Sequence, residues 1–157
     1  MIYSIATIPV NPAGEIPLTR SQAWRGLVLK ARDARLFLPP NLCTRCEIVD
    51  DRTTHIVREA TIAGDDLREI ISFDPEKKVS FFQVTGPREG VIINELFEDS
   101  AGALQLRFYC YTGLRGKQPG GPEEQAEQAW MDSDAGYKSA LLSTLKRTRA
   151  LLEQGRL

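Results

Sequence analysis

Three charged residues, Arg58, Glu69 and Glu95, occupy positions that the alternation of apolar and polar residues assigns to the apolar side of β-strands. Such alternation is typical of a sheet with one covered face. A charge on a covered face must be paired or must shift its pKa, because an unpaired buried charge is strongly unfavourable. These three residues are therefore the first candidates for chemistry in this chain.

The first two of these charges belong to one predicted hairpin, with its turn at 63–66. Opposed residues of an antiparallel pair share a face. This register opposes Ala60 to Glu69 and Arg58 to Ile71, so Arg58 and Glu69 are diagonal neighbours within reach of a bidentate contact. Two interpretations stay open: a structural ion pair, or two charges that orient a ligand in an apolar cavity.

The third charge belongs to a second predicted hairpin, with its turn at 98–103. This register opposes Glu95 to Leu106 and places no basic residue across from it. Burial among apolar neighbours would raise the pKa of the Glu95 carboxyl, which suits a general acid or base but also occurs in any apolar pocket. We therefore assign no catalytic residue and keep Glu95 as the alternative. The apolar residues expected on the same face include Phe82, Val84, Val91, Ile93, Phe97, Phe108 and Cys110.

The remaining reactive side chains do not form a convincing site. Cys43 and Cys46 have the spacing of a redox pair, but they fall at the start of a predicted strand and not at a helix N-terminus, which would lower a thiol pKa. With His55 and Cys110 they would supply four zinc ligands, yet the alternation sends these two residues to opposite faces. We expect no metal and no cofactor.

Residues 113–121 form a predicted loop rich in Gly, Lys, Arg and Pro. The loop lacks the Ser or Thr that follows Gly-Lys in a phosphate-binding loop. It is either a plain flexible connection or a lid over a cavity.

The elements that position these residues follow a simple order. A strand over 2–10 precedes a helix that begins at Thr19 and Gln22, which form a capping box. A short second helical turn ends at Pro39 and Pro40. About six antiparallel strands then fill 43–112, and a long helix follows. The pattern predicts one α+β domain over 1–157.

The predicted long C-terminal helix has residues typical of a helix start at its N-terminal end and of a helix stop at its C-terminal end. Pro122 suits its first position and Gly155 its end. Its apolar stripe begins with Trp130 and Tyr137, whose rings carry polar groups, and only then becomes aliphatic. This change predicts a surface that is hollow at one end. The segment 132–136 either ends a shorter helix or bends the long one.

Composition narrows the class of protein. The charges nearly cancel, with a formal net charge of −1, and no basic run indicates a nucleic-acid surface. No stretch is apolar and long enough to span a membrane, and no secretory signal is evident. Three cysteines, an odd count, are read as free thiols of a cytoplasmic protein. We also expect no exposed apolar patch for protein partners.

Several stretches resemble one family. They are Val10-Asn11-Pro12, Leu18-Thr19-Arg20 with Trp24-Arg25-Gly26-Leu27, Arg58-Glu59, and Thr144-Leu145 with Arg149 and Gly155. These motifs and the order of elements resemble the AtaL-like family of the START/SRPBCC superfamily, which includes the birch-pollen-allergen-like proteins. The resemblance implies a helix-grip fold, in which a sheet of seven antiparallel strands wraps around a long helix and leaves a hydrophobic cavity between the two. It supplies no catalytic residues.

We therefore expect a protein that binds a small hydrophobic or aromatic molecule, lipid-like or polyketide-like, between sheet and helix. The alternative is a polyketide cyclase or aromatase that uses cavity carboxylates for acid–base chemistry. The oligomeric state stays open. The residues expected to line the ligand site are Arg58, Glu69, Phe82, Val91, Ile93, Glu95, Phe108, Trp130 and Tyr137.

Overall fold

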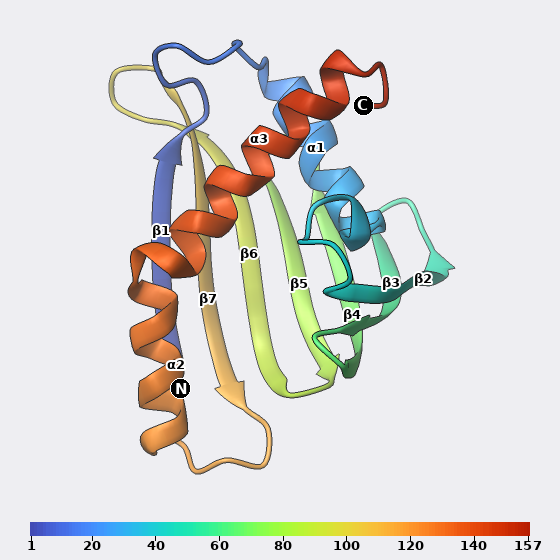
Figure 1. Ribbon diagram of the computed structural model, residues 1–157, viewed down its shortest axis with the longest axis vertical. Coiled ribbons are helices and arrows are strands. Elements are labelled where there is room, and N and C mark those ends of the chain that lie inside the picture. Colours follow the sequence, from blue (N-terminus) through green and yellow to red (C-terminus); the bar gives the residue numbers. More distant parts are fainter.

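One open antiparallel sheet organises the chain, and the computed structural model describes all of residues 1–157 (Figure 1). Its seven strands lie in the order β1-β7-β6-β5-β4-β3-β2, so the first strand pairs with the last. The elements are β1 (Ile2–Pro9), α1 (Arg20–Arg32), η1 (Ala34–Leu36), β2 (Cys43–Asp51), β3 (His55–Ile62), β4 (Asp65–Asp74), β5 (Lys78–Thr85), β6 (Arg88–Glu98), β7 (Leu104–Leu114), α2 (Pro122–Asp132), η2 (Asp134–Lys138) and α3 (Ser139–Glu153). The α+β helix-grip fold predicted from the sequence is confirmed.

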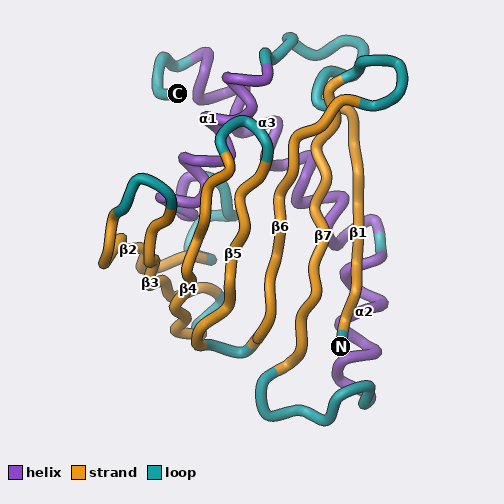
Figure 2. Tube along the Cα trace, turned by 180° about the vertical axis from the view of Figure 1, so that it is seen from behind, coloured by secondary structure: helices purple, strands orange, loops and turns teal.

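All helices lie on one face of the sheet. In Figure 1, α1 and α3 cross in front of the strands and α2 runs beside β1. Figure 2 shows the other face from behind, with no helix covering it. The main core lies between the two layers, where residues such as Ile56, Ile71, Leu106 and Leu141 are fully buried. No helix is both long and apolar enough to cross a membrane.

Helix α1 begins as its sequence predicts and packs tightly on α3. The Gln22 amide donates to Thr19 Oγ1 at 3.1 Å, and the Thr19 amide donates to Gln22 Oε1 at 2.9 Å, which completes the capping box. Further along α1, Gly26 faces Thr148 of α3. A Cβ atom at position 26 would collide with the Thr148 side chain. Glycine at this position therefore sets the distance between the two helices.

The segment 132–136 ends a shorter helix, because α2 stops at Asp132 and Ser133 has extended backbone angles (φ −77°, ψ 163°). Gly136 has non-helical backbone angles (φ −84°, ψ −126°), and a Cβ there would come within 2.5 Å of the Met131 carbonyl oxygen. The chain therefore turns between α2 and α3. The turn splits the apolar stripe, so that Tyr137 is buried while Trp130 is 51% exposed.

The first hairpin keeps its predicted faces with a different register. Its turn consists of Ala63 and Gly64 alone, both with positive φ (52° and 85°), as in a type I′ turn. Arg58 therefore lies directly opposite Glu69 and not diagonally from it. A shift of two residues leaves each side chain on its face. Arg58 and Glu69 are accordingly buried, with 4% and 5% exposure.

The second hairpin differs by one residue, which reverses the faces of β6. Its loop spans 99–103, where Asp99 Oδ1 accepts hydrogen bonds from the amides of Ala101 and Ala103. Glu98 therefore pairs with Leu104, in place of the predicted Phe97. A shift of one residue moves every side chain of a strand to the other face. The predicted inward placement of Val91, Ile93, Glu95 and Phe97 is wrong, and Ile92, Asn94 and Leu96 point inward instead.

The register of β6 also determines which side chains of its neighbours β7 and β5 face the helices. On β7, Leu106, Phe108 and Cys110 are buried on the helix side, as predicted. On β5, Phe82 pairs with the outward-facing Val91 and is 45% exposed, while Phe81 is buried. The predicted inward placement of Phe82 and Val84 is therefore wrong.

The face of the sheet that no helix covers (Figure 2) carries a row of apolar residues, which the strand register and their exposure identify. The register aligns Ile70, Phe82, Val91, Tyr111 and Tyr3 across five neighbouring strands, and we call these residues the outer apolar band. Four of them are 41–49% exposed. The expectation that no apolar patch is exposed is wrong, because it depended on the reversed faces of β5 and β6.

Candidate functional site

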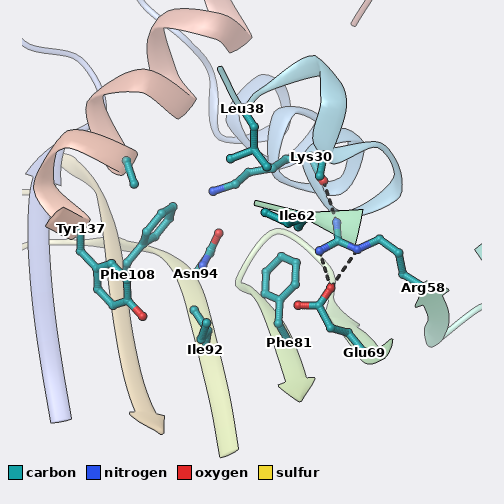
Figure 3. A pocket seen from close by; sticks show the side chains of 12 residues that line it. Lys30, Leu38, Arg58, Ile62, Glu69, Phe81, Ile92, Asn94, Phe108 and Tyr137 are labelled. Carbon is teal, nitrogen blue, oxygen red and sulfur yellow. Dashed lines mark hydrogen bonds and ion pairs between the residues drawn. The ribbon is translucent and has the colours of Figure 1, made fainter. Parts of the chain in front are cut away.

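A cavity of about 200 Å³ lies between the concave face of the sheet, the end of α1 and the start of α3 (Figure 3). Its wall is mainly apolar. Ala140 on its lining is exposed to solvent, so the cavity reaches the surface at the N-terminal end of α3. The apolar lining consists of Ala34, Leu38, Ile62, Phe81, Ile92, Phe108 and Ala140, and the polar lining of Lys30, Arg58, Glu69, Asn94 and Tyr137.

Arg58 and Glu69 form one wall as a fully paired unit. Arg58 Nε donates to Glu69 Oε2 at 2.9 Å, and Arg58 Nη2 contacts the same oxygen. Arg58 Nη1 donates to the Ala31 carbonyl at 2.8 Å, where α1 ends and its carbonyl groups lack helical partners. Gln83 Nε2 donates to the other carboxylate oxygen of Glu69 at 2.9 Å. The pair therefore joins α1 to the sheet, as the interpretation of a structural ion pair predicts, and it also lines the cavity.

Lys30 brings an amine to the cavity from the last turn of α1. Its Nζ lies 4.3 Å from the centre of the Phe108 ring and donates to Thr144 Oγ1 at 3.1 Å. Burial, together with the nearby positive charge of Arg58, lowers the pKa of Lys30 to about 7. The amine therefore changes its charge near neutral pH.

Two buried polar atoms in the lining have no partner within the protein. They are Asn94 Oδ1 and the Tyr137 hydroxyl. Asn94 is 2% exposed and Tyr137 9%, and the Tyr137 ring meets Phe108 edge-on at 6.3 Å. Burial raises the pKa of Tyr137 far above its ordinary value, so its hydroxyl keeps its proton. Buried polar groups are nearly always hydrogen-bonded, so these two atoms are exceptions in the lining of the cavity.

The structure brings together only part of the predicted site. Four of the nine residues, Arg58, Glu69, Phe108 and Tyr137, line the cavity. The other five do not: Phe82, Val91, Ile93 and Glu95 lie on the outer face of the sheet, and Trp130 is exposed on α2.

Glu95 forms an ion pair with Arg107 on the outer face of the sheet, which the sequence analysis did not predict. It lies directly opposite Arg107, whose Nη2 donates to Glu95 Oε2 at 2.7 Å and whose Nε donates at 3.0 Å. The prediction of an inward carboxyl without a basic neighbour is wrong. A proton-transfer role in the cavity is therefore excluded for Glu95 in this arrangement.

The site predicted from the sequence did not include four residues that line the cavity: Lys30, Phe81, Ile92 and Asn94. For Lys30 a signal existed, because it continues the buried face of α1 that Ala23 and Leu27 define at steps of three and four. For the other three, the signal was the length of the β6–β7 loop. That length fixes which side chains of β6 face inward, and the pairing of β5 with β6 then fixes the face of Phe81.

The other motifs do not contribute to this cavity. Cys43, Cys46 and Cys110 are buried free thiols. No group of three or more His, Cys, Asp or Glu side chains is placed to hold a metal ion. The loop over 113–121 supplies no lining residue, so the structure gives no support to its reading as a lid.

Comparison with known proteins places this arrangement in a class. The fold is that of the START/SRPBCC superfamily. The family model described as "Acetylaranotin biosynthesis cluster protein L" matches residues 5–155, and the chain belongs to this AtaL family. Among curated protein sequences, none matches the chain.

Solved structures share the fold at low sequence identity. The Zhui aromatase/cyclase from Streptomyces sp. R1128 is 16% identical, with a TM-score of 0.68 over 96% of this chain and 94% of that one. Ara h 8.0201 is 10% identical, with a TM-score of 0.64 over 94% and 97%. The di-domain ARO/CYC StfQ from the steffimycin biosynthetic pathway is 10% identical, with a TM-score of 0.64 over 98% of this chain and 51% of that one.

Proposed function

We propose that this protein binds a small, mainly apolar ring compound in the cavity between the sheet and helices α1 and α3. The observation that carries this proposal is an apolar cavity whose lining includes Asn94 and Tyr137, two residues with buried polar atoms, Oδ1 and Oη, that have no hydrogen-bond partner in the protein. An apolar wall with a few convergent polar groups is the usual composition of a small-molecule site. The ligand would fill the cavity and satisfy both atoms.

The size of the cavity limits the ligand. A dry protein cavity of about 150 Å³ binds benzene, so a cavity of about 200 Å³ suits a compound of one or two rings. A longer lipid or polyketide chain would have to extend through the opening beside Ala140 or widen the cavity. The description of the family and the aromatase/cyclases among the structural relatives support an aromatic or polyketide-like ligand.

A cyclase or aromatase is the second candidate, now on different residues. Glu95 lies outside the cavity, and Glu69 is occupied by Arg58 and Gln83. Lys30 is the lining group that can exchange a proton near neutral pH, which is the property required of a general base. The binding role needs no such step, and it remains the function that the geometry supports best.

The cellular location belongs to the same proposal. The three cysteines are buried and unpaired, which suits a reducing compartment. We propose a cytoplasmic location on this basis.

Native mass spectrometry of protein purified from its own host tests the binding role. We expect a second species, heavier by the mass of a small molecule that is released on unfolding. The variant Ala140→Trp, which places a large ring at the opening of the cavity, should purify without it. Leu142→Trp, on an exposed position of the same helix, is the control and should retain the ligand. Equal occupancy in Ala140→Trp would contradict the proposed site.

A further inference from the structure

The cavity holds one positive charge more than it can neutralise when Lys30 is protonated. The titratable groups of its lining are Lys30 from α1, Arg58 from β3, Glu69 from β4 and Tyr137 from η2. Glu69 is engaged by Arg58 and by Gln83, and the Tyr137 hydroxyl keeps its proton. No carboxylate is therefore left for Lys30. A buried charge without a counter-ion is unfavourable, unless a bound molecule supplies one.

The contacts of Lys30 leave room for such a partner. Thr144 Oγ1 donates its own proton to the Ala140 carbonyl at 2.8 Å, so it accepts one hydrogen bond from Lys30. The Phe108 ring attracts the charge of the amine but takes up no conventional hydrogen bond. An ammonium group has three protons. Figure 3 shows that Lys30 and Asn94 point into the same space beside Phe108.

We propose that the ligand carries an acidic oxygen, as a carboxylate, phenolate or enolate, that pairs with Lys30. This inference rests on the proposed binding function and names the ligand class. The acidic oxygen accepts a hydrogen bond from Lys30, and the ring of the ligand lies against Phe108. The Tyr137 hydroxyl can donate to a second oxygen, and Asn94 Oδ1 can accept from a hydroxyl group.

The proton balance of binding follows from the state of Lys30. In the free protein its pKa is about 7, so the amine is mainly neutral at about pH 8. An anion beside it raises that pKa. A carboxylate that binds at about pH 8 therefore takes up close to one proton from the buffer, and this proton stays on Lys30. A neutral molecule of the same shape takes up none.

Isothermal titration calorimetry with a matched pair of probes tests this inference. The probes are 2-naphthoate and 2-acetylnaphthalene, which have the same ring system and nearly the same shape. At about pH 8, in two buffers of different ionisation enthalpy, we expect naphthoate to bind at least about 10-fold more tightly, with uptake of nearly one proton. Lys30→Met should bind both probes equally, without proton uptake. Lys146→Met, at an exposed position of α3, is the control and should keep the preference.

The outcomes separate the two proposals. Equal binding of both probes to the unmodified protein, or a preference that persists in Lys30→Met, would overturn the acidic-ligand inference and leave cavity binding intact. Binding of neither probe would contradict the cavity function itself, and the inference with it.

A second inference comes from the opposite face of the sheet. On the same face as the outer apolar band, and separated from it by one row of residues, the register aligns a row of charged residues on strands β4, β5, β6 and β7: Asp74, Lys78, Glu95 and Arg107. Their signs alternate along the row. No helix covers either row (Figure 2).

The order of charges along this row, negative, positive, negative, positive, is complementary to the same row placed against it in the opposite direction. Consider a two-fold axis parallel to the strands and between β5 and β6. It would place Asp74 of one copy against Arg107 of the other, and Lys78 against Glu95, so that opposite charges meet at each position. The same operation places Phe82 against Val91 and would cover the apolar band. Two-fold dimers use one self-complementary surface in this way.

We infer that two copies of this chain pair through the outer face of the sheet. Sheets that pack face to face keep their strand directions within about 30°, which this axis satisfies. The apolar band would form the centre of the interface, and the alternating charges would form its rim and fix its register.

Sedimentation velocity over a range of about 1 µM to 1 mM protein tests the pairing. We expect a dimer that is lost in Phe82→Ser and weakened about 10-fold or more in Lys78→Glu, because two copies of Glu would then oppose Glu95. Leu142→Ser and Lys146→Glu, exposed changes on α3, are the controls and should remain dimeric. A monomer at all concentrations, or a dimer that Phe82→Ser leaves unchanged, would overturn this inference.

Discussion

Removal of one partner from the Arg58–Glu69 pair should destabilise the protein far more than removal of both. In Glu69→Leu, the guanidinium of Arg58 keeps its carbonyl partner at Ala31 but loses its counter-ion at a site that is 4% exposed. Breaking a buried pair in this way costs about 3–5 kcal/mol. A domain of this size is stable by about 5–15 kcal/mol in total. The melting temperature should therefore fall by roughly 6–20 °C.

The double variant Arg58→Met/Glu69→Leu removes both charges together. It leaves the Ala31 carbonyl and the Gln83 amide without their side-chain partners, which corresponds to a loss of about 1–3 kcal/mol. The double variant should therefore be more stable than the sum of the single losses predicts, with a coupling energy of several kcal/mol.

Urea unfolding followed by far-ultraviolet circular dichroism measures this cycle. The matched control is the exposed pair Arg68–Glu59 on the outer face, where the same substitutions should change the free energy of unfolding by less than about 1 kcal/mol. Single losses below about 1 kcal/mol at Arg58 and Glu69, with an additive double variant, would refute the reasoning.

Three further predictions concern other elements. Between about pH 7 and 10.5, Lys30 binds more protons in the unfolded chain than in the folded protein. The free energy of unfolding, measured with urea, should therefore rise with pH relative to that of Lys30→Met, by at most about 1.4 kcal/mol per pH unit. Identical pH curves for the two proteins would contradict the lowered pKa of Lys30. Gly26→Ala should lower the free energy of unfolding by about 1–3 kcal/mol because the new methyl group collides with Thr148, and an unchanged midpoint would refute this contact. Glu95→Gln, which breaks a half-buried surface pair with Arg107, should leave ligand affinity in a titration unchanged within about 2-fold; a larger loss would place Glu95 in the site.

Much of the fold could be predicted from local signals. The capping box at Thr19 and Gln22 located α1, and the strict alternation around Arg58 and Glu69 assigned both to the covered face. That assignment survived an error of two residues in the turn, because a shift of two preserves the face.

The site could be predicted only in part, because it depends on loop length. The faces of β6 depend on one residue in the loop after Glu98, where the hydrogen bonds of Asp99 close a loop over 99–103. Apolar residues on both sides of β6, such as Val91 and Ile92, removed the alternation that would have fixed the register. The bend at Gly136 likewise depends on close contacts with the preceding turn, which no periodicity reports.

The central claim is that a small ring compound occupies the cavity beside Phe108 and Tyr137. A fluorescence titration with an apolar dye of two fused rings tests it most directly, with Ala140→Trp as the blocking variant and Leu142→Trp as its control. We predict binding at about micromolar dissociation constant to the unmodified protein and to Leu142→Trp, and a loss of at least about 10-fold in Ala140→Trp. An absence of binding to the unmodified protein, or equal affinity in all three proteins, would contradict the claim.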